Sequence, residues 1–126
     1  MSSSRHAAVH FLDFQNQSQM PVVYQACDLF CLPSKGPGET WGLAVNEAMA
    51  TGKAIIISNR VGCSEDLVSS KNGTIFSAGN LEELKMNLQS ILNLNLFNLG
   101  ENSKEIIQNW SFNKQVDIFT KEFQKL

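Results

Sequence analysis

The 126-residue sequence has no long apolar run and no cluster of basic residues. Its longest apolar runs, such as AIII at residues 54–57, fall far short of the roughly 20 residues that a helical membrane span needs. Ten Lys and Arg residues are scattered among 12 acidic ones, and the formal net charge is −2. A nucleic-acid-binding surface normally gathers basic residues. We therefore expect neither a membrane span nor a nucleic-acid partner.

The motifs of several enzyme classes are also absent from the sequence. It contains no Ser/His/Asp arrangement, no Walker loop and no cluster with metal-ligand spacing, which disfavours a hydrolase or a metalloenzyme. The three cysteines, Cys27, Cys31 and Cys63, lie in apolar contexts and predict reduced thiols that are mostly in the core. A zinc site built from Cys27, Cys31 and a distant His is the alternative, although no spacing supports it. We expect no metal and no cofactor.

The first ten residues lack the apolar centre of a secretory signal peptide, which predicts a cytoplasmic protein. Residues 1–8 are polar or small, and we expect them to be frayed. With 43% hydrophobic and 17% charged residues, the composition is typical of one globular domain, or most of one. We therefore expect residues 1–126 to form one unit, a whole domain or part of one.

Apolar runs and helical periodicities alternate along the chain. Short runs bounded by turn residues predict strands, at residues 10–13, 29–32, 54–58 and 74–76. Helical spacing predicts helices at residues 19–26, 41–50 and 81–92, a short one from residue 64, one around residues 104–108 and one after Trp110-Ser111-Phe112. Ser18, Ser64 and Asn80 are the expected caps. Leu81, Leu84, Met86, Leu88 and Leu92 are expected to face the core. This order predicts an α/β fold with a parallel sheet covered by helices on both faces.

The segment PSKGPGETWGLAVNEAMATGKAIIIS, residues 33–58, is predicted to be the centre of the protein. Glu39 closes a loop rich in Gly and Pro, and Glu47 lies inside a helix that is apolar nearly all round. We expect that helix to be buried on most faces. A buried carboxylate is costly unless it is paired, hydrogen-bonded or given a ligand. Gly52 then ends the helix at a position that favours a left-handed conformation.

This segment resembles the signature of the family 4, or group 1, glycosyltransferases. The resemblance rests on Glu39 and Glu47 with seven residues between them, on Trp41-Gly42-Leu43, and on Glu47-Ala48-Met49-Ala50 followed by Gly52-Lys53 and a β-branched strand. It implies a retaining, metal-independent hexosyltransferase of the GT-B type, with two Rossmann-like domains and a UDP-, GDP- or ADP-sugar as substrate. The similarity runs roughly over residues 9–110. It implies that this chain is a truncated part of the C-terminal, donor-binding domain.

The residue types of the segment suit the binding of a nucleotide sugar. The start of the helix, near residues 40–43, offers backbone N–H groups and a positive dipole end to a phosphate, and Gly42 allows close approach. By resemblance, Glu47 binds the ribose and Glu39 contacts the transferred sugar as the catalytic residue. The motif residues Trp41, Gly42 and Leu43 join Glu47 in binding the donor. The alternative interpretation, if each residue is considered without the motif, is that Glu39 is an ordinary solvated loop residue and that Glu47 is a helix-edge residue paired with a lysine.

Other positions give weaker indications. Lys35 and Arg60 could donate to phosphate, but a surface role is expected for each. The family usually has two glycines at the positions of Gly62 and Cys63. By this resemblance, Cys63 adds a side chain near the sugar pocket. Glu65 stands where the family has a glutamate.

The alternatives to a transferase are a nucleotide-sugar epimerase of similar architecture and a non-catalytic remnant that only binds nucleotide or partners. Members of the family also have an acceptor domain and two further strands in the donor domain, and the resemblance does not include these parts. The isolated chain is therefore expected to be inactive, and its acceptor is not identified. In the sheet of the family, two other strands lie between the strand that corresponds to residues 10–13 and the strand that corresponds to residues 29–32. Without them, the strand at residues 29–32 has an open edge. We expect it to pair with the first strand, with a second copy, or with the missing part of the domain.

Overall fold

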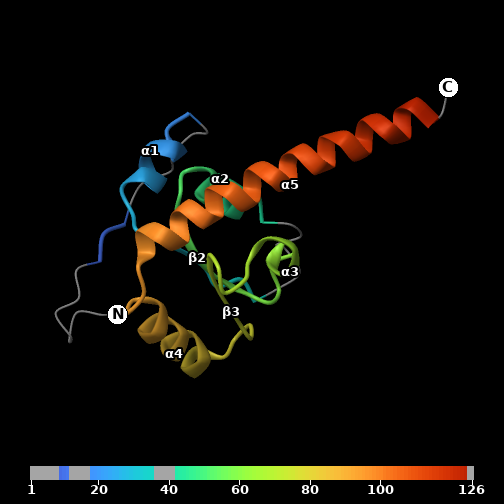
Figure 1. Cartoon of the computed structure of the whole chain (residues 1–126). Coiled ribbons are helices and arrows are strands. Elements are labelled where there is room, and N and C mark those ends of the chain that lie inside the picture. The colour runs from blue at the N-terminus through green and yellow to red at the C-terminus, as the bar shows by residue number, and fades with distance from the viewer. Residues whose placement is uncertain (1–8, 12–17, 36–41, 125–126) are drawn as a thin grey trace.

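The computed structural model describes residues 9–11, 18–35 and 42–124, and the side chains of residues 111–119 and 121–123 are outside that description. Figure 1 shows a small sheet with helices around it and one long helix that extends beyond the body. The elements, in chain order, are α1 (Met20–Gln25), β1 (Leu29–Leu32), α2 (Leu43–Ala50), β2 (Ala54–Ser58), α3 (Ser64–Leu67), β3 (Gly73–Phe76), α4 (Leu81–Ile91) and α5 (Leu96–Gln124).

The sheet has three parallel strands in the order β1-β2-β3. In the register, Ala54 of β2 lies beside Leu29 of β1, and Ile55 lies beside Gly73 of β3. All five residues of β2 are buried. Because side chains alternate along a strand, its residues divide between two cores, with Ile55 and Ile57 in one and Ala54 in the other. The α/β class, with a parallel sheet covered on both faces, is confirmed.

The larger core lies between the sheet and the layer formed by α1, α2, α3 and the first half of α5. Its buried members, which come from five elements and two loops, include Tyr24, Val45, Met49, Ile55, Ile57, Val61, Leu67, Val68 and Ile107. Helix α5 approaches the turn after α2 so closely that a Cβ on Gly100 would overlap the carbonyl of Gly52. This close approach explains why a residue without a side chain stands at position 100.

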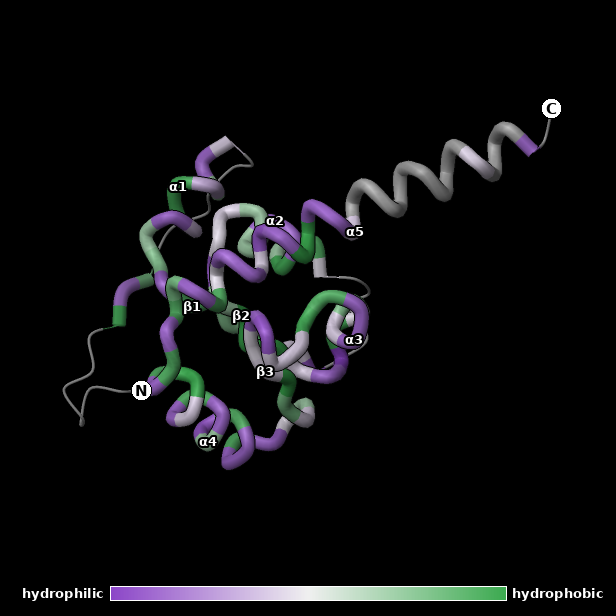
Figure 2. The backbone as a smooth tube through the Cα atoms, in the orientation of Figure 1, coloured by the Kyte–Doolittle hydropathy of each residue, from purple (hydrophilic) through white to green (hydrophobic). Residues whose placement is uncertain are grey.

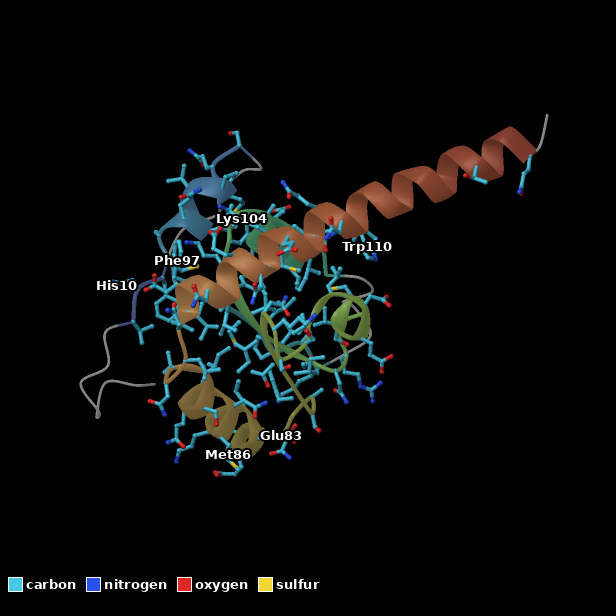
Figure 3. All side chains as sticks on the ribbon, in the orientation of Figure 1. His10, Glu83, Met86, Phe97, Lys104 and Trp110 are labelled. Carbon is cyan, nitrogen blue, oxygen red and sulfur yellow. The ribbon has the colours of Figure 1, made fainter. Side chains whose placement is uncertain are left out.

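The smaller core, on the opposite face, is formed by Ala54, Ile91 and Leu99 with the partly buried Leu29 and Leu96. Helix α4 contacts β3 on this side, and of its residues only Ile91 is buried. Leu81 is 73% exposed and Met86 is 64% exposed, with Met86 at the periphery of Figure 3. The expectation that Leu81, Met86 and Leu92 lie in the core is therefore wrong. The described sheet is only three strands wide, so α4 can bury only a narrow apolar stripe.

Local signals at the helix ends are confirmed in part. The Asn80 side chain caps α4 by accepting a hydrogen bond from the Glu83 backbone N–H at 3.0 Å. Gly52 has φ +81°, as expected for a residue in the left-handed region. Helix α1 begins after Gln19 rather than Ser18, and α3 begins after Cys63, although neither of these residues supplies a side-chain cap.

The long helix α5 differs from the sequence expectation. Two helices separated by Trp110-Ser111-Phe112 were expected, whereas one helix runs without a break over Leu96–Gln124. After Gly100 the sequence contains no further Gly or Pro, so no residue with a strong helix-breaking tendency interrupts it. Figure 2 shows green apolar positions where α5 crosses the body of the protein. No described helix, α5 included, combines the length and apolar character of a membrane span.

The strand expected at residues 10–13 is not formed by its described residues. Residues 9–11 have no strand assignment, and the Phe11 side chain is 93% exposed. Residues 12 and 13 lie outside the description. Within the described part of the chain, β1 therefore pairs with β2 alone. Its sequence, LFCL, carries neither a charge nor a proline, the usual devices that protect an edge strand from pairing with another chain.

We predict that the isolated 126-residue chain self-associates through the free edge of β1, because pairing with a second copy satisfies the unpaired backbone groups. Light scattering over a concentration series should give an apparent mass that rises above that of the monomer. The matched variant Cys31→Lys places a charge at an exposed position of β1 and should shift the protein toward the monomer. A cooperatively folded wild-type monomer at every concentration would contradict this prediction.

Candidate functional site

The loops that follow the three strands lie at the carboxyl edge of the sheet, where ligands bind in open α/β proteins. Two hydrogen bonds join these loops. The Ser58 hydroxyl, at the end of β2, donates to the Ser34 carbonyl after β1 at 2.5 Å. The Asn59 side-chain oxygen accepts from the Ala78 backbone N–H after β3 at 3.0 Å. The three loops are therefore tied to one another through the end of β2.

Helix α2 begins at this edge, and its first turn is set by Gly42. Gly42 has φ +91° and ψ +60°, in the left-handed region. A Cβ there would lie 2.5 Å from Val61 Cγ1 and 3.6 Å from Cys63 Sγ, both in the segment after β2. Only glycine fits this conformation and this contact without a shift of its neighbours. The start of α2 is thus fixed against the β2–α3 loop.

The N-terminus of α2 offers polar backbone groups. Gly42, the N-cap residue, forms no side-chain cap, and Leu43, the first helical residue, is 68% exposed. The Val45 N–H already donates to the Gly42 carbonyl at 2.9 Å. The N–H groups before it at a helix start have no intrahelical acceptor, and the helix dipole places a partial positive charge there. This end of α2 is therefore suited to an anion. Of the eight residues of α2, only Leu43 and Ala50 are exposed, which agrees with the expectation that this helix is buried on most faces.

Glu47 lies one turn further along α2 and is half-buried. Tyr24 of α1 belongs to the same core as Ala48 and Met49, the residues that follow Glu47 on α2. Burial of Tyr24 and the negative charge of Glu47 raise the pKa of the Tyr24 phenol to about 12. The sequence did not indicate that Tyr24 and Glu47 lie near each other.

The sugar end of the expected site lies outside the described residues. Glu39 and Trp41 fall within residues 36–41, so their roles stay predictions. Of the expected donor-binding residues, the structure brings Gly42, Leu43 and Glu47 together on α2. Lys35 and Arg60 are exposed, as expected for surface residues. Glu65, on α3, is exposed as well.

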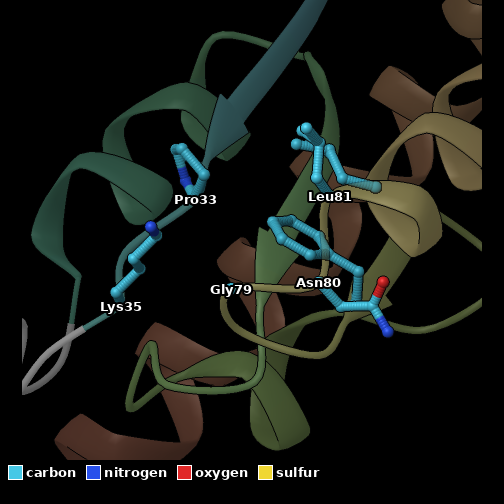
Figure 4. A pocket seen from close by; sticks show the side chains of 7 residues that line it. Pro33, Lys35, Gly79, Asn80 and Leu81 are labelled. Atoms are coloured by element: carbon cyan, nitrogen blue, oxygen red, sulfur yellow. The ribbon is translucent and has the colours of Figure 1, made fainter.

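A hollow of about 320 Å³ lies beside this edge, toward α4. It is lined by the segment after β1 and by the end of β3 with the start of α4, namely Pro33, Lys35, Phe76, Gly79, Asn80, Leu81 and Leu84. Figure 4 shows Pro33 and Lys35 on one side of it, across from Asn80 and Leu81. Sequence reasoning missed this hollow, because Leu81 and Leu84 have the spacing of core residues.

The three cysteines occupy different environments. Cys63 is buried in the larger core close to Gly42, Cys27 is half-buried, and Cys31 is exposed on β1. The expectation of mostly core cysteines is therefore wrong for Cys31, because no described element covers that part of β1. Among the described residues, no group of three or more His, Cys, Asp or Glu side chains is arranged to hold a metal ion.

Two solved structures resemble this chain in fold. Sucrose-phosphate synthase from Thermosynechococcus elongatus superposes with a TM-score of 0.73 and 23% identity, over 93% of this chain and 31% of that protein. The Anabaena protein HepE, solved in complex with UDP, gives a TM-score of 0.67 and 23% identity, over 84% of this chain and 30% of that protein. These likenesses confirm a Rossmann-like fold of the GT-B kind.

Curated relatives share more of the sequence. A Campylobacter jejuni protein named N,N'-diacetylbacillosaminyl-diphospho-undecaprenol alpha-1,3-N-acetylgalactosaminyltransferase is 34% identical over 85 residues, which is 68% of this chain and 22% of that protein. An uncharacterized glycosyltransferase of Methanocaldococcus jannaschii is 32% identical over 109 residues, covering 83% of this chain and 27% of that protein. The chain thus spans less than a third of the length of either relative. The family model of the group 1 glycosyl transferases matches residues 4–110, and the chain belongs to that family.

Proposed function

We propose that this chain supplies the donor-binding part of a retaining, family 4 glycosyltransferase, and that α2 holds the nucleotide sugar. The observation that carries the proposal is the arrangement of α2 at the carboxyl edge of the sheet. Its N-cap residue is Gly42, which has no side chain to cap the helix, and Glu47 lies one turn beyond Leu43, the first helical residue. Membership of the group 1 family supports the proposal, because the matched region includes this helix.

The diphosphate of the donor binds at the start of α2. Backbone N–H groups and the helix dipole favour an anion there, without any need for a metal ion. The left-handed Gly42 lets a phosphate oxygen approach the backbone, since no Cβ stands in the way. The exposed Leu43 leaves this end of the helix open.

Glu47 binds the ribose. A carboxylate has two oxygens with about four acceptor positions, so it can accept from two vicinal hydroxyls and still keep a bond to a protein donor. The position of Glu47 one turn beyond Leu43 suits a ligand whose phosphates lie at the helix start. The donor is a UDP-, GDP- or ADP-sugar, and the UDP bound by the Anabaena neighbour is consistent with this class.

Glu39 and Trp41 complete the donor site at the sugar end, with Glu39 contacting the transferred sugar. The acceptor contacts belong to parts of the relatives that this chain does not match, and the isolated chain is inactive for that reason. The proposed location is the cytoplasm.

The first prediction of this proposal concerns the ribose contact. Glu47→Gln keeps the size of the side chain but removes the charge that strengthens its bonds to hydroxyls. A hydrogen bond to a charged group contributes about 1.5 to 3 kcal/mol, so nucleotide affinity should fall by roughly tenfold or more. Titration calorimetry with UDP, GDP and ADP measures this loss. The control Glu105→Gln changes an exposed carboxylate on α5 and should leave affinity unchanged; equal affinity of Glu47→Gln and wild type would exclude the ribose role.

The second prediction concerns the sugar. In a protein of the relatives' full length that carries this segment, Glu39→Ala should lower kcat more than it lowers affinity for free nucleotide. The reason is that Glu39 contacts the group that moves, so its interactions are strongest while transfer occurs. Steady-state kinetics together with UDP binding separate the two effects. Unchanged turnover at saturating donor, with weakened binding of free nucleotide, is the outcome that contradicts a catalytic role.

A further inference from the structure

The connection between α4 and α5, here called the α4–α5 corner (residues 92–97), carries three large apolar side chains that face solvent. Leu92 is 59% exposed, Leu94 is 56% exposed and Phe97 is 73% exposed. The sequence of the corner is LNLNLF, and residues 86–100 contain no charged residue. Single exposed apolar residues are ordinary, whereas several close together mark a surface that contacts a partner.

The corner is an ordered turn in which several peptide groups are already paired. The Leu94 N–H donates to the Ile91 carbonyl at 3.0 Å, and the Leu99 N–H donates to the Asn95 carbonyl at 3.1 Å. The Asn95 side-chain oxygen caps α5 by accepting from the Asn98 N–H at 3.1 Å. Unpaired peptide groups are costly to remove from water, so these bonds lower the cost of burying the corner in an apolar phase.

The corner lies at the amino edge of the sheet. The smaller core supports it through Ile91 and Leu99, which flank the corner and pack with Leu29 and Ala54, the first residues of β1 and β2. Figure 3 labels Phe97 at the start of α5. The proposed donor site is at the carboxyl edge, where these strands end. A partner bound at the corner therefore leaves the donor site open.

The composition of the corner suits a lipid surface better than a protein. Its polar residues, Asn93 and Asn95, are neutral, so the insertion of its apolar side chains desolvates no charge. A specific protein interface takes about 800 Å² from roughly 20 to 30 residues of each partner, and a corner of six residues offers much less. A bilayer interface accepts apolar side chains without a complementary shape, and the strength of binding follows the apolar area that is buried.

We propose that the α4–α5 corner is a peripheral anchor that inserts Leu92, Leu94 and Phe97 into the interface of a lipid bilayer. The contact is shallow, since no described helix has the length and apolar character of a span. Because the corner contains no basic residue, the hydrophobic effect drives the contact and anionic lipid is not required. The proposal does not depend on the donor site, so each can fail without the other.

Flotation of the 126-residue chain with phosphatidylcholine vesicles tests the anchor. The wild type should float with the vesicles to a similar extent at low and at high salt. The double variant Leu94→Gln/Phe97→Gln should bind at least about tenfold more weakly, because each large apolar side chain that is buried favours the bound state by about that factor. The matched control Val22→Gln/Leu81→Gln changes two residues of similar exposure, 72% and 73%, outside the corner and should bind like the wild type.

A fluorescence measurement tests which part of the surface enters the lipid. In Phe97→Trp, the emission that exceeds that of the wild type should move to shorter wavelength when the vesicles are added, because the new indole leaves water. Subtraction of the wild-type signal removes the contribution of Trp41 and Trp110. The control Leu81→Trp should show no such shift.

Three results would overturn the proposal. The first is a wild type that does not float with phosphatidylcholine vesicles, or a corner variant that binds them as well as the control variant does at an equal Tm. The second is binding that needs anionic lipid and low salt, which indicates an electrostatic contact elsewhere. The third is an emission of Phe97→Trp that vesicles leave unchanged while the corner variant has a lower apparent mass than the wild type in light scattering, which makes the partner a second copy.

Discussion

The burial of β2 on both of its faces is the constraint on which the rest of the structure depends. Each of its five residues, AIIIS, is enclosed, and its two edges pair with β1 and β3. Burying an Ile side chain contributes on the order of 1.5 to 3 kcal/mol, so the three isoleucines alone provide a substantial share of the stability of a chain this size. The helices on either face are held by this one strand. Because β1 and β3 run parallel to β2, the loops that follow all three strands lie at the same edge of the sheet.

The candidate site depends on the polar end of β2. Ser58 and Asn59 connect the loops after β1 and β3, and Val61 meets Gly42 where α2 begins. The start of α2 therefore has a definite position relative to the sheet, although the residues just before it are outside the description. A helix N-terminus and a carboxylate on the same helix keep a fixed spacing. That fixed spacing is what a ligand with a diphosphate and a ribose requires.

Local sequence signals predicted much of this arrangement. The strands at residues 29–32 and 54–58, the left-handed Gly52 and the Asn80 cap each depend on a few neighbouring residues, and all four are confirmed. The choice of α2 as the centre of the site came from the motif around Glu47. The roles of Glu39 and Trp41 are untested, because residues 36–41 are not described.

The features that could not be predicted depend on contacts between distant segments. Tyr24 of α1 and Glu47 of α2 lie near each other, and no spacing in the sequence indicates this. The exposure of Leu81 and Met86 follows from the width of the sheet rather than from the helical pattern of α4. A strand at residues 10–13 depends on pairing with a distant segment, and its described residues, 10 and 11, have no strand assignment. The continuity of α5 was missed because an aromatic-Ser-aromatic sequence is only a weak helix breaker.

Binding of the donor nucleotide at α2 is tested most directly by following the backbone amides of the 126-residue chain by NMR during titration with UDP, GDP and ADP. We expect saturable shifts for at least one nucleotide, largest over residues 42–47 and smaller on α4. The absence of saturable binding by all three, or shifts confined to the hollow between Pro33 and Leu84, would contradict binding at α2.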